Sequence, residues 1–223
     1  MTLRALANTL LSSLFEPPCA ACAQALRHPL DGAVCDHCWA SIRSGVALNE
    51  HLHGRHGVDW IGAVDLYEGR LRDIIHALKY ERRRSIARPL GALMRTSGAP
   101  LLNGAAAVVP VPLHPDRERD RGFNQADDLA RQLGLPVAPL LRRVRFTTSQ
   151  IELPAEERHR NVRDAFRLAR IPDPRFRIPA VIVLVDDVST TGATLDACAR
   201  VLKAGGVKEV RALTAARVVT GRR

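Results

Sequence analysis

The sequence predicts an α/β fold with a mainly parallel sheet and flanking helices, preceded by a small cysteine-rich module. Short apolar runs rich in β-branched residues alternate with segments that repeat apolar residues at helical spacing. Four cysteines lie between residues 19 and 38, outside this alternation. A length of 223 residues with 46% apolar residues suits one small module and one ordinary domain. We therefore predict two domains, residues 1–55 and 56–223.

The N-terminal segment reads as an amphipathic helix of roughly a dozen residues. Its apolar residues at helical spacing are Leu3, Leu6, Leu10, Leu11, Leu14 and Phe15. Asn8 and Thr9 interrupt the apolar run, which argues against a secretory signal. We expect the helix to pack on the protein, with a membrane-surface role as the alternative. No stretch reaches the length of a membrane span, so the expected location is the cytoplasm.

The cysteines form two Cys-x-x-Cys pairs, Cys19 with Cys22 and Cys35 with Cys38, separated by twelve residues. Each pair places two thiolates on one side of a metal ion, and two pairs complete a tetrahedron. The spacing therefore predicts a structural zinc ribbon. Two disulfides are the alternative, but nothing in the sequence indicates an oxidising compartment.

The remaining elements follow in chain order after a weakly patterned connector. Apolar runs predict strands at residues 58–67, 106–109, 181–185 and 207–215. Apolar spacing predicts helices at residues 71–80, 86–93, 123–133 and 195–204. Gly134 and the pair Gly205-Gly206 mark helix ends. Residues 115–121 are highly charged, and we expect them to form a loop.

The strand at residues 181–185 leads into the most informative segment of the chain. Asp186 and Asp187 follow the strand. A run of small and hydroxyl-bearing residues then precedes the helix, namely Ser189, Thr190, Thr191, Gly192, Ala193 and Thr194. A tight loop at a helix N-terminus binds anions through backbone N–H groups and the helix dipole. Carboxylates touching a phosphate would repel it, so the acids fit better one sugar away, where they accept hydrogen bonds from ribose hydroxyls. The residues alone suggest a ribose-5-phosphate pocket.

This arrangement resembles the signature of type I phosphoribosyltransferases, which bind phosphoribosyl pyrophosphate (PRPP). The resemblance implies that Asp186 and Asp187 are catalytic residues that hold the ribose 2′- and 3′-hydroxyls, while residues 190–194 hold the 5′-phosphate. It also implies that Mg²⁺ binds with PRPP. In an enzyme of this class, pyrophosphate leaves as a nitrogenous acceptor attacks the ribose.

Residues 109–125 supply candidates for binding the pyrophosphate. A strand runs into a proline-stiffened turn, and arginines follow at the end of the sheet where such folds bind ligands. The candidates are Val111, Pro112, Arg117 and Arg121. The alternative is a solvated, self-neutralising loop, because acidic residues interleave with the arginines. Many catalysing relatives have a basic or glycine-rich turn here, so the sequence supports binding better than turnover.

The Pro-Val-Pro-Leu turn, followed by Arg-x-x-x-Arg-Gly-Phe-Asn-Gln at residues 117–125, resembles the ComF family. Further similar segments lie at residues 78–80, 145–153, 158–162 and 165–166. Members combine a zinc ribbon with a phosphoribosyltransferase-like domain, and the resemblance implies PRPP-type ligands and a link to DNA uptake in natural transformation. Three hypotheses follow: a phosphoribosyltransferase with an unknown acceptor, a single-stranded DNA-binding competence factor acting with DNA-uptake proteins, and a PRPP-sensing regulator without turnover.

The net charge of +10 lies entirely in residues 56–223, because residues 1–55 hold four basic and four acidic side chains. Such an excess fits a polyanionic partner, either nucleic acid or pyrophosphate. Aromatic residues make up 4% of the chain, which is too few to indicate a stacking surface for single-stranded nucleic acid.

Overall fold

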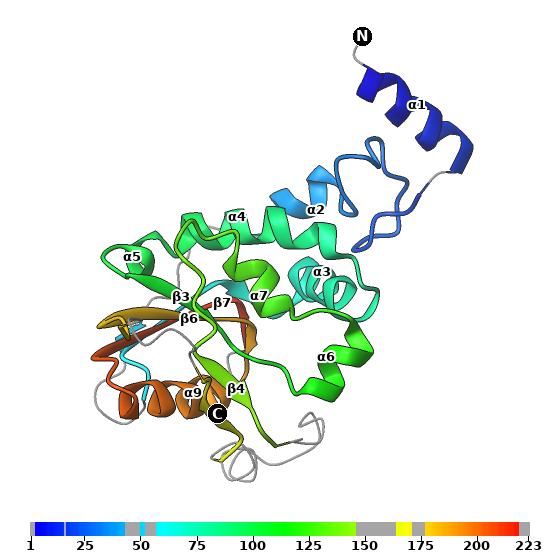
Figure 1. Ribbon diagram of the computed structural model, residues 1–223. Coiled ribbons are helices and arrows are strands. Elements are labelled where there is room, and N and C mark those ends of the chain that lie inside the picture. Colours follow the sequence, from blue (N-terminus) through cyan, green and yellow to red (C-terminus); the bar gives the residue numbers. More distant parts are fainter. Residues whose placement is uncertain are drawn as a thin grey trace, which may run out of the picture.

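The computed structural model describes residues 3–15, 17–42, 50–51, 57–145, 164–170 and 177–218 (Figure 1). Most of the ComF-like segment at residues 145–162 lies outside these ranges.

The described residues contain a five-stranded sheet in the order β1-β2-β7-β6-β3. Its strands are β1 (Glu50–His51), β2 (Trp60–Leu66), β3 (Ala107–Pro110), β6 (Val181–Ser189) and β7 (Glu209–Arg217). Strands β2, β7, β6 and β3 run parallel, and β1 pairs with β2 antiparallel at one edge. The prediction of an α/β fold with a mainly parallel sheet is confirmed.

Helices cover both faces of this sheet (Figure 1). They are α3 (Gly69–Tyr80), η1 (Arg84–Ile86), α4 (Ala87–Ser97), α5 (Ala99–Leu102), α6 (Pro115–Arg121), α7 (Gln125–Ala130) and α9 (Ala193–Ala204). On one face, α3, α4 and α7 share a core with Val183 and Val185 of β6. On the other face, α9 shares a core with Ile182 and Leu184. Alternate residues of β6 therefore point to opposite layers, as in any pleated strand.

A separate antiparallel pair, β4 (Leu141–Arg143) and β5 (Phe166–Leu168), packs on the α9 side of the sheet. Phe166 is fully buried in this core. The sequence did not predict these strands, because three residues each are too few to show a period.

The N-terminal module contains α1 (Leu3–Phe15) and α2 (Asp36–Ala40). Buried residues of the module, among them Leu26 and Ile42, join the core formed by α3 and α4. The expected N-terminal helix is present, but part of its apolar surface does not pack on the protein. Leu10 and Phe15 are 60% and 73% exposed, and Figure 1 shows α1 extending away from the sheet.

One polar contact anchors α1 to the module, because Asn8 is buried and its Oδ1 accepts the N–H of Leu30 at 2.9 Å. Within the described ranges, no helix is both long enough and apolar enough to cross a membrane.

Two local predictions are wrong. Residues 115–121 form the helix α6 rather than a loop, because Pro115 begins it and acidic and basic residues occupy the turns that the helix dipole favours. The helix predicted at 123–133 is the shorter α7, because Gly122 in the left-handed region (φ 82°) and Asn124 at the N-cap set its start.

Candidate functional site

Asp186 and Asp187 lie near the end of β6 rather than after it, because the ladder with β7 continues to the pair Ser189 and Arg217. As neighbours in a strand, the two acids point toward opposite layers. Asp186 is partly exposed, whereas Asp187 is only 3% exposed. The Oδ1 of Asp187 accepts the N–H of Val188 at 2.7 Å. The acids are therefore adjacent in sequence but unequal in access.

Asp186 faces the cationic part of the site. Its carboxyl group is surrounded by protein, and this burial raises the pKa of Asp186 to about 6, although Lys79, Arg143 and Arg121 oppose the shift. The group is therefore mostly ionised near neutral pH and becomes neutral in mild acid.

Lys79 is the ion-pair partner of Asp187. It lies in the last turn of α3, and its Nζ is 2.7 Å from Oδ2 of Asp187, with side chains 16% and 4% exposed. Burial lowers the pKa of Lys79 to about 8, while the carboxylate of Asp186 opposes the shift. The amine is still mainly charged at neutral pH.

The loop after β6 connects the strand to α9, and it contains the residues that the sequence predicts to bind a phosphate. Ser189 is buried within the strand ladder, and Thr190 is exposed. Gly192 has φ 76°, a left-handed conformation that glycine adopts without strain, and α9 begins at Ala193. The Oγ1 of Thr191 accepts the N–H of Ala193 at 3.4 Å. The N-terminus of α9, with Thr194 in its first turn, thus follows the acid pair after residues 188–192.

The Arg-Gly-Phe-Asn-Gln motif holds Arg121 near Asp186 of β6. Arg121 donates to Oε1 of Gln125, and its Cζ lies 5.6 Å from the centroid of the Tyr80 ring. Phe123 is buried in the core. Asn124 accepts the N–H of Ala126 at 3.0 Å and donates to the carbonyl of Val111 at 3.0 Å. The motif thus connects α6, α7 and the end of β3.

A cationic pocket of about 360 Å³ lies next to the acids. It is lined by Lys79, Tyr80, Arg82, Arg117, Asp120 and Arg121. Two of the predicted pyrophosphate ligands, Arg117 and Arg121, line it. The other two have no N–H for an anion, because the N–H of Val111 donates to Val185 at 2.9 Å and Pro112 has none.

Arg143 is a site residue that the sequence did not predict. It extends from β4 over the ring of Phe166, with Cζ 5.3 Å from the ring centroid. Burial lowers the pKa of Arg143, nearby Arg117 adds to the shift, and Asp186 opposes it. No sequence signal marked this arginine, because it lies on a strand of three residues and only the fold brings it near Asp186.

The four predicted zinc ligands are together. The Sγ atoms of Cys19, Cys22, Cys35 and Cys38 all lie within 4.8 Å of one another. The Cys19–Cys38 and Cys22–Cys35 distances are 3.9 and 3.8 Å. Sulfurs around a tetrahedral zinc ion would be about 3.8 Å apart, whereas disulfide sulfurs are about 2.0 Å apart. The geometry fits zinc, and all four cysteines are free thiols.

Backbone donors prepare one of these thiols for metal. The N–H groups of Cys35 and Ala21 donate to Sγ of Cys19, each at 3.4 Å. Burial opposes ionisation of Cys19, but these donors outweigh it and lower the pKa of the thiol to about 6. Thiolates are the form that binds zinc.

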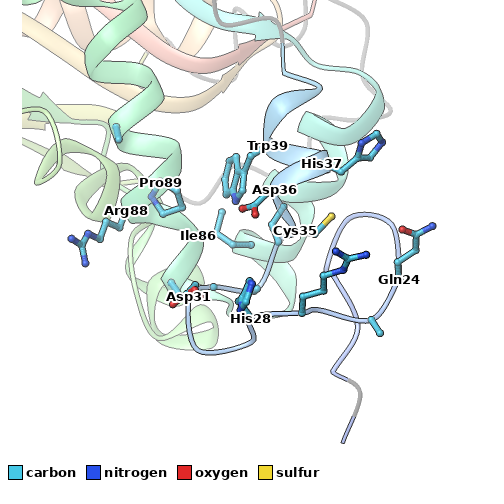
Figure 2. A pocket seen from close by; sticks show the side chains of 17 residues that line it. Gln24, His28, Asp31, Cys35, Asp36, His37, Trp39, Ile86, Arg88 and Pro89 are labelled. Carbon is cyan, nitrogen blue, oxygen red and sulfur yellow. The ribbon is translucent and has the colours of Figure 1, made fainter. Parts of the chain in front are cut away.

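A larger pocket, of about 750 Å³, lies away from the acids, between the N-terminal module and α4. Figure 2 shows Ile86 and Pro89 on one side of it, with His28 and Asp31 from the module on the other. Of the predicted site residues, only Cys35 lines it. We therefore place the candidate site at the end of β6, not in this pocket.

Comparison with known proteins identifies related chains. Residues 119–223 match the family model described as phosphoribosyl transferase domain. The DNA utilization protein YhgH of Salmonella typhi is 33% identical over 211 residues, covering 86% of this chain and 87% of that protein. Competence protein F of Haemophilus influenzae is 40% identical over 110 residues, which is 47% of each chain.

A third relative, competence protein ComFC of Streptococcus pneumoniae, is 32% identical over 109 residues, covering 49% of this chain and 47% of that protein. The matched phosphoribosyl transferase domain includes the acid pair, its loop and α9. With 33% identity sustained over 87% of a YhgH protein, the chain belongs to the ComF/YhgH family.

Proposed function

We propose that the protein binds PRPP, or a closely related ribose phosphate, together with Mg²⁺ at the carboxyl end of β6. One observation carries the proposal: an acid pair, a tight loop at the N-terminus of α9 and a cationic pocket meet around the end of one strand. Lys79 connects the pocket to the acid pair, because it lines the pocket and contacts Asp187.

Each part of the ligand has a chemically matched partner. The backbone N–H groups and helix dipole at residues 190–194 suit the 5′-phosphate. The carboxylate of Asp186, a residue of intermediate exposure, suits the ribose hydroxyls. Arg117 and Arg121 suit the diphosphate, since guanidinium groups bind phosphate oxygens through paired donors.

The residues present also fit Mg²⁺. This ion prefers oxygen ligands and is usually held by one or two carboxylates plus substrate phosphates. Asp186 supplies such a carboxylate beside the pocket where the diphosphate would bind. When bound, Mg²⁺ would neutralise part of the diphosphate charge.

We further propose phosphoribosyl transfer to a nitrogenous acceptor as the reaction of this site. Positive charge develops at the anomeric carbon as pyrophosphate leaves, and the carboxylate of Asp186 would stabilise that charge. Arg117 and Arg121 would stabilise the leaving pyrophosphate. Release of pyrophosphate from PRPP in the presence of candidate bases tests this step, and binding without release would favour a PRPP-sensing regulator.

Calorimetric titration of PRPP with Mg²⁺ tests the binding itself. We expect the wild type to bind and the Asp186→Asn/Asp187→Asn variant to lose most of its affinity. Zinc content and circular dichroism would confirm that both proteins are folded. A folded, zinc-loaded wild type that binds no PRPP would refute the proposal.

Single-stranded DNA binding is a second candidate function, favoured by the charge of residues 56–223 and by relatives named for DNA utilization and competence. If arginines hold the phosphate backbone, affinity for an oligonucleotide should fall steeply and linearly in a log–log plot against salt concentration. Fluorescence anisotropy from 50 to 200 mM salt would measure the slope. Affinity that salt does not change would exclude this mode of binding.

A further inference from the structure

Asp187 is not open to a ligand in the structure as it stands. One of its oxygens accepts the N–H of Val188 at 2.7 Å, and the other is 2.7 Å from the ammonium of Lys79. Its side chain is 4% exposed. A ribose hydroxyl can therefore reach this carboxylate only if Lys79 or the N–H of Val188 moves away from it.

Lys79 is the partner that can move. It also lines the cationic pocket, so an anion that enters this pocket meets its ammonium. The flanking guanidiniums are held by groups of the protein itself: Arg121 donates to Gln125, and Arg82 donates to the carbonyl of Asp120. Lys79 instead carries a compact ammonium with three donors on a flexible stem.

We propose that Lys79 makes the site selective for ribose phosphates that carry a diphosphate, because the diphosphate draws its ammonium away from Asp187 and opens that carboxylate to the sugar. The exchange leaves neither group without a hydrogen-bond partner: the ammonium passes from a carboxylate to a phosphate, and the carboxylate accepts a ribose hydroxyl in its place. A ligand without the diphosphate cannot displace Lys79 and meets only Asp186. This inference rests on the proposed PRPP site and adds a selectivity that the acid pair alone does not provide.

Three ligands separate this role from a structural one. PRPP, ribose 5-phosphate and pyrophosphate would each be titrated with Mg²⁺ into the wild type and Lys79→Met. We expect Lys79→Met to reduce the preference for PRPP over ribose 5-phosphate by about tenfold or more, the effect of one charge-assisted hydrogen bond. Lys79→Arg should recover part of that preference.

Replacing Asp187, the other partner of the ion pair, should increase an affinity rather than reduce one. Asp187→Asn releases Lys79, so the affinity of this variant for pyrophosphate should rise. The rise should be several-fold larger than in Asp186→Asn, a control that removes the same charge from the neighbouring residue. The double variant Lys79→Met/Asp187→Asn should lose this gain. It also avoids leaving a buried carboxylate unpaired, so it keeps the test valid if Lys79→Met folds poorly.

Lys203→Met is the matched control. Lys203 also forms a 2.7 Å ion pair, with Asp59, at the other end of the sheet. The Lys203→Met variant should leave all three affinities within about twofold of wild type, because among the described residues Lys203 shares no partner with the candidate site. If PRPP binds and Lys79→Met leaves the preference unchanged, the inference is wrong while the proposed function stands. If a folded wild type binds none of the three ligands, both are wrong.

Discussion

At the scale of single residues, the acid pair divides into an accessible and an inaccessible member. Asp186 is partly exposed, and burial of its carboxyl raises its pKa to about 6. Asp187 is closed by Lys79 and by its own neighbour in the strand. A ribose phosphate that leaves Lys79 in place should therefore contact Asp186 and not Asp187. The ionisation of Asp186 should then govern the pH dependence of its binding.

The ratio of wild-type to Asp186→Asn affinity for ribose 5-phosphate isolates this ionisation, because the titration of the ligand itself cancels. At pH 7.5 the ratio should be about 10 to 100, the effect of losing a charged acceptor. Protonation removes the carboxylate as the pH falls through about 6, so the ratio should shrink toward one near pH 5. Calorimetry from pH 5 to 8 would measure it, and a constant ratio would contradict the assignment.

The sequence identified Asp186, Asp187 and their loop because these residues are consecutive. It did not connect Lys79 to Asp187, since 108 positions separate them and only the packing of α3 on β6 brings them together. Arg143 was missed for the same reason. Side chains that come from distant elements are visible only when the layers of the fold are known.

At the scale of elements, the segment from α6 to α7 shows how a charged stretch becomes ordered. Acidic residues in the first turn and arginines in the last turn stabilise α6 despite its lack of buried residues. A pattern search based on apolar spacing cannot detect such a helix, which explains the incorrect loop prediction. The turn between the two helices then directs Arg121 toward the site.

Asn124 holds this turn, and its replacement should be costly. Asn124→Ala removes the N-cap of α7 and the hydrogen bond to the carbonyl of Val111. We expect a loss of about 1–2 kcal/mol in the free energy of unfolding, measured by urea denaturation. Asn103→Ala, at an exposed position after α5, should cost less than about 0.5 kcal/mol. Equal losses in the two variants would show that the cap does not stabilise the turn.

At the scale of the whole molecule, the cysteine-rich module and the sheet domain share one core. Cys19 and Cys38 belong to the same buried cluster as residues of α3 and α4, including Ile75 and Leu90. The two-module division predicted from sequence describes the order of the chain, but this shared core implies that the stability of the module and that of the domain are linked.

Zinc removal should therefore weaken more than the module. Cys38→Ser replaces a fully buried cysteine and should abolish zinc binding, expected at one ion per chain. If the shared core loosens by about 3 kcal/mol, the Tm should fall by roughly 6–12 °C. Zinc content by mass spectrometry and Tm by calorimetry would be measured together. Reducing agent alone should change neither value, because none of the five cysteines forms a disulfide.

Cys198→Ala provides the control for this experiment. Cys198 is equally buried but lies in α9, in the core on the other face of the sheet. It should keep its full zinc content even if its own cavity lowers the Tm. Loss of zinc from Cys38→Ser without any change in the unfolding of the sheet domain would show that the two parts are energetically independent. A shared transition that shifts with zinc would instead mean that the metal supports the scaffold on which Lys79 and the acid pair are placed.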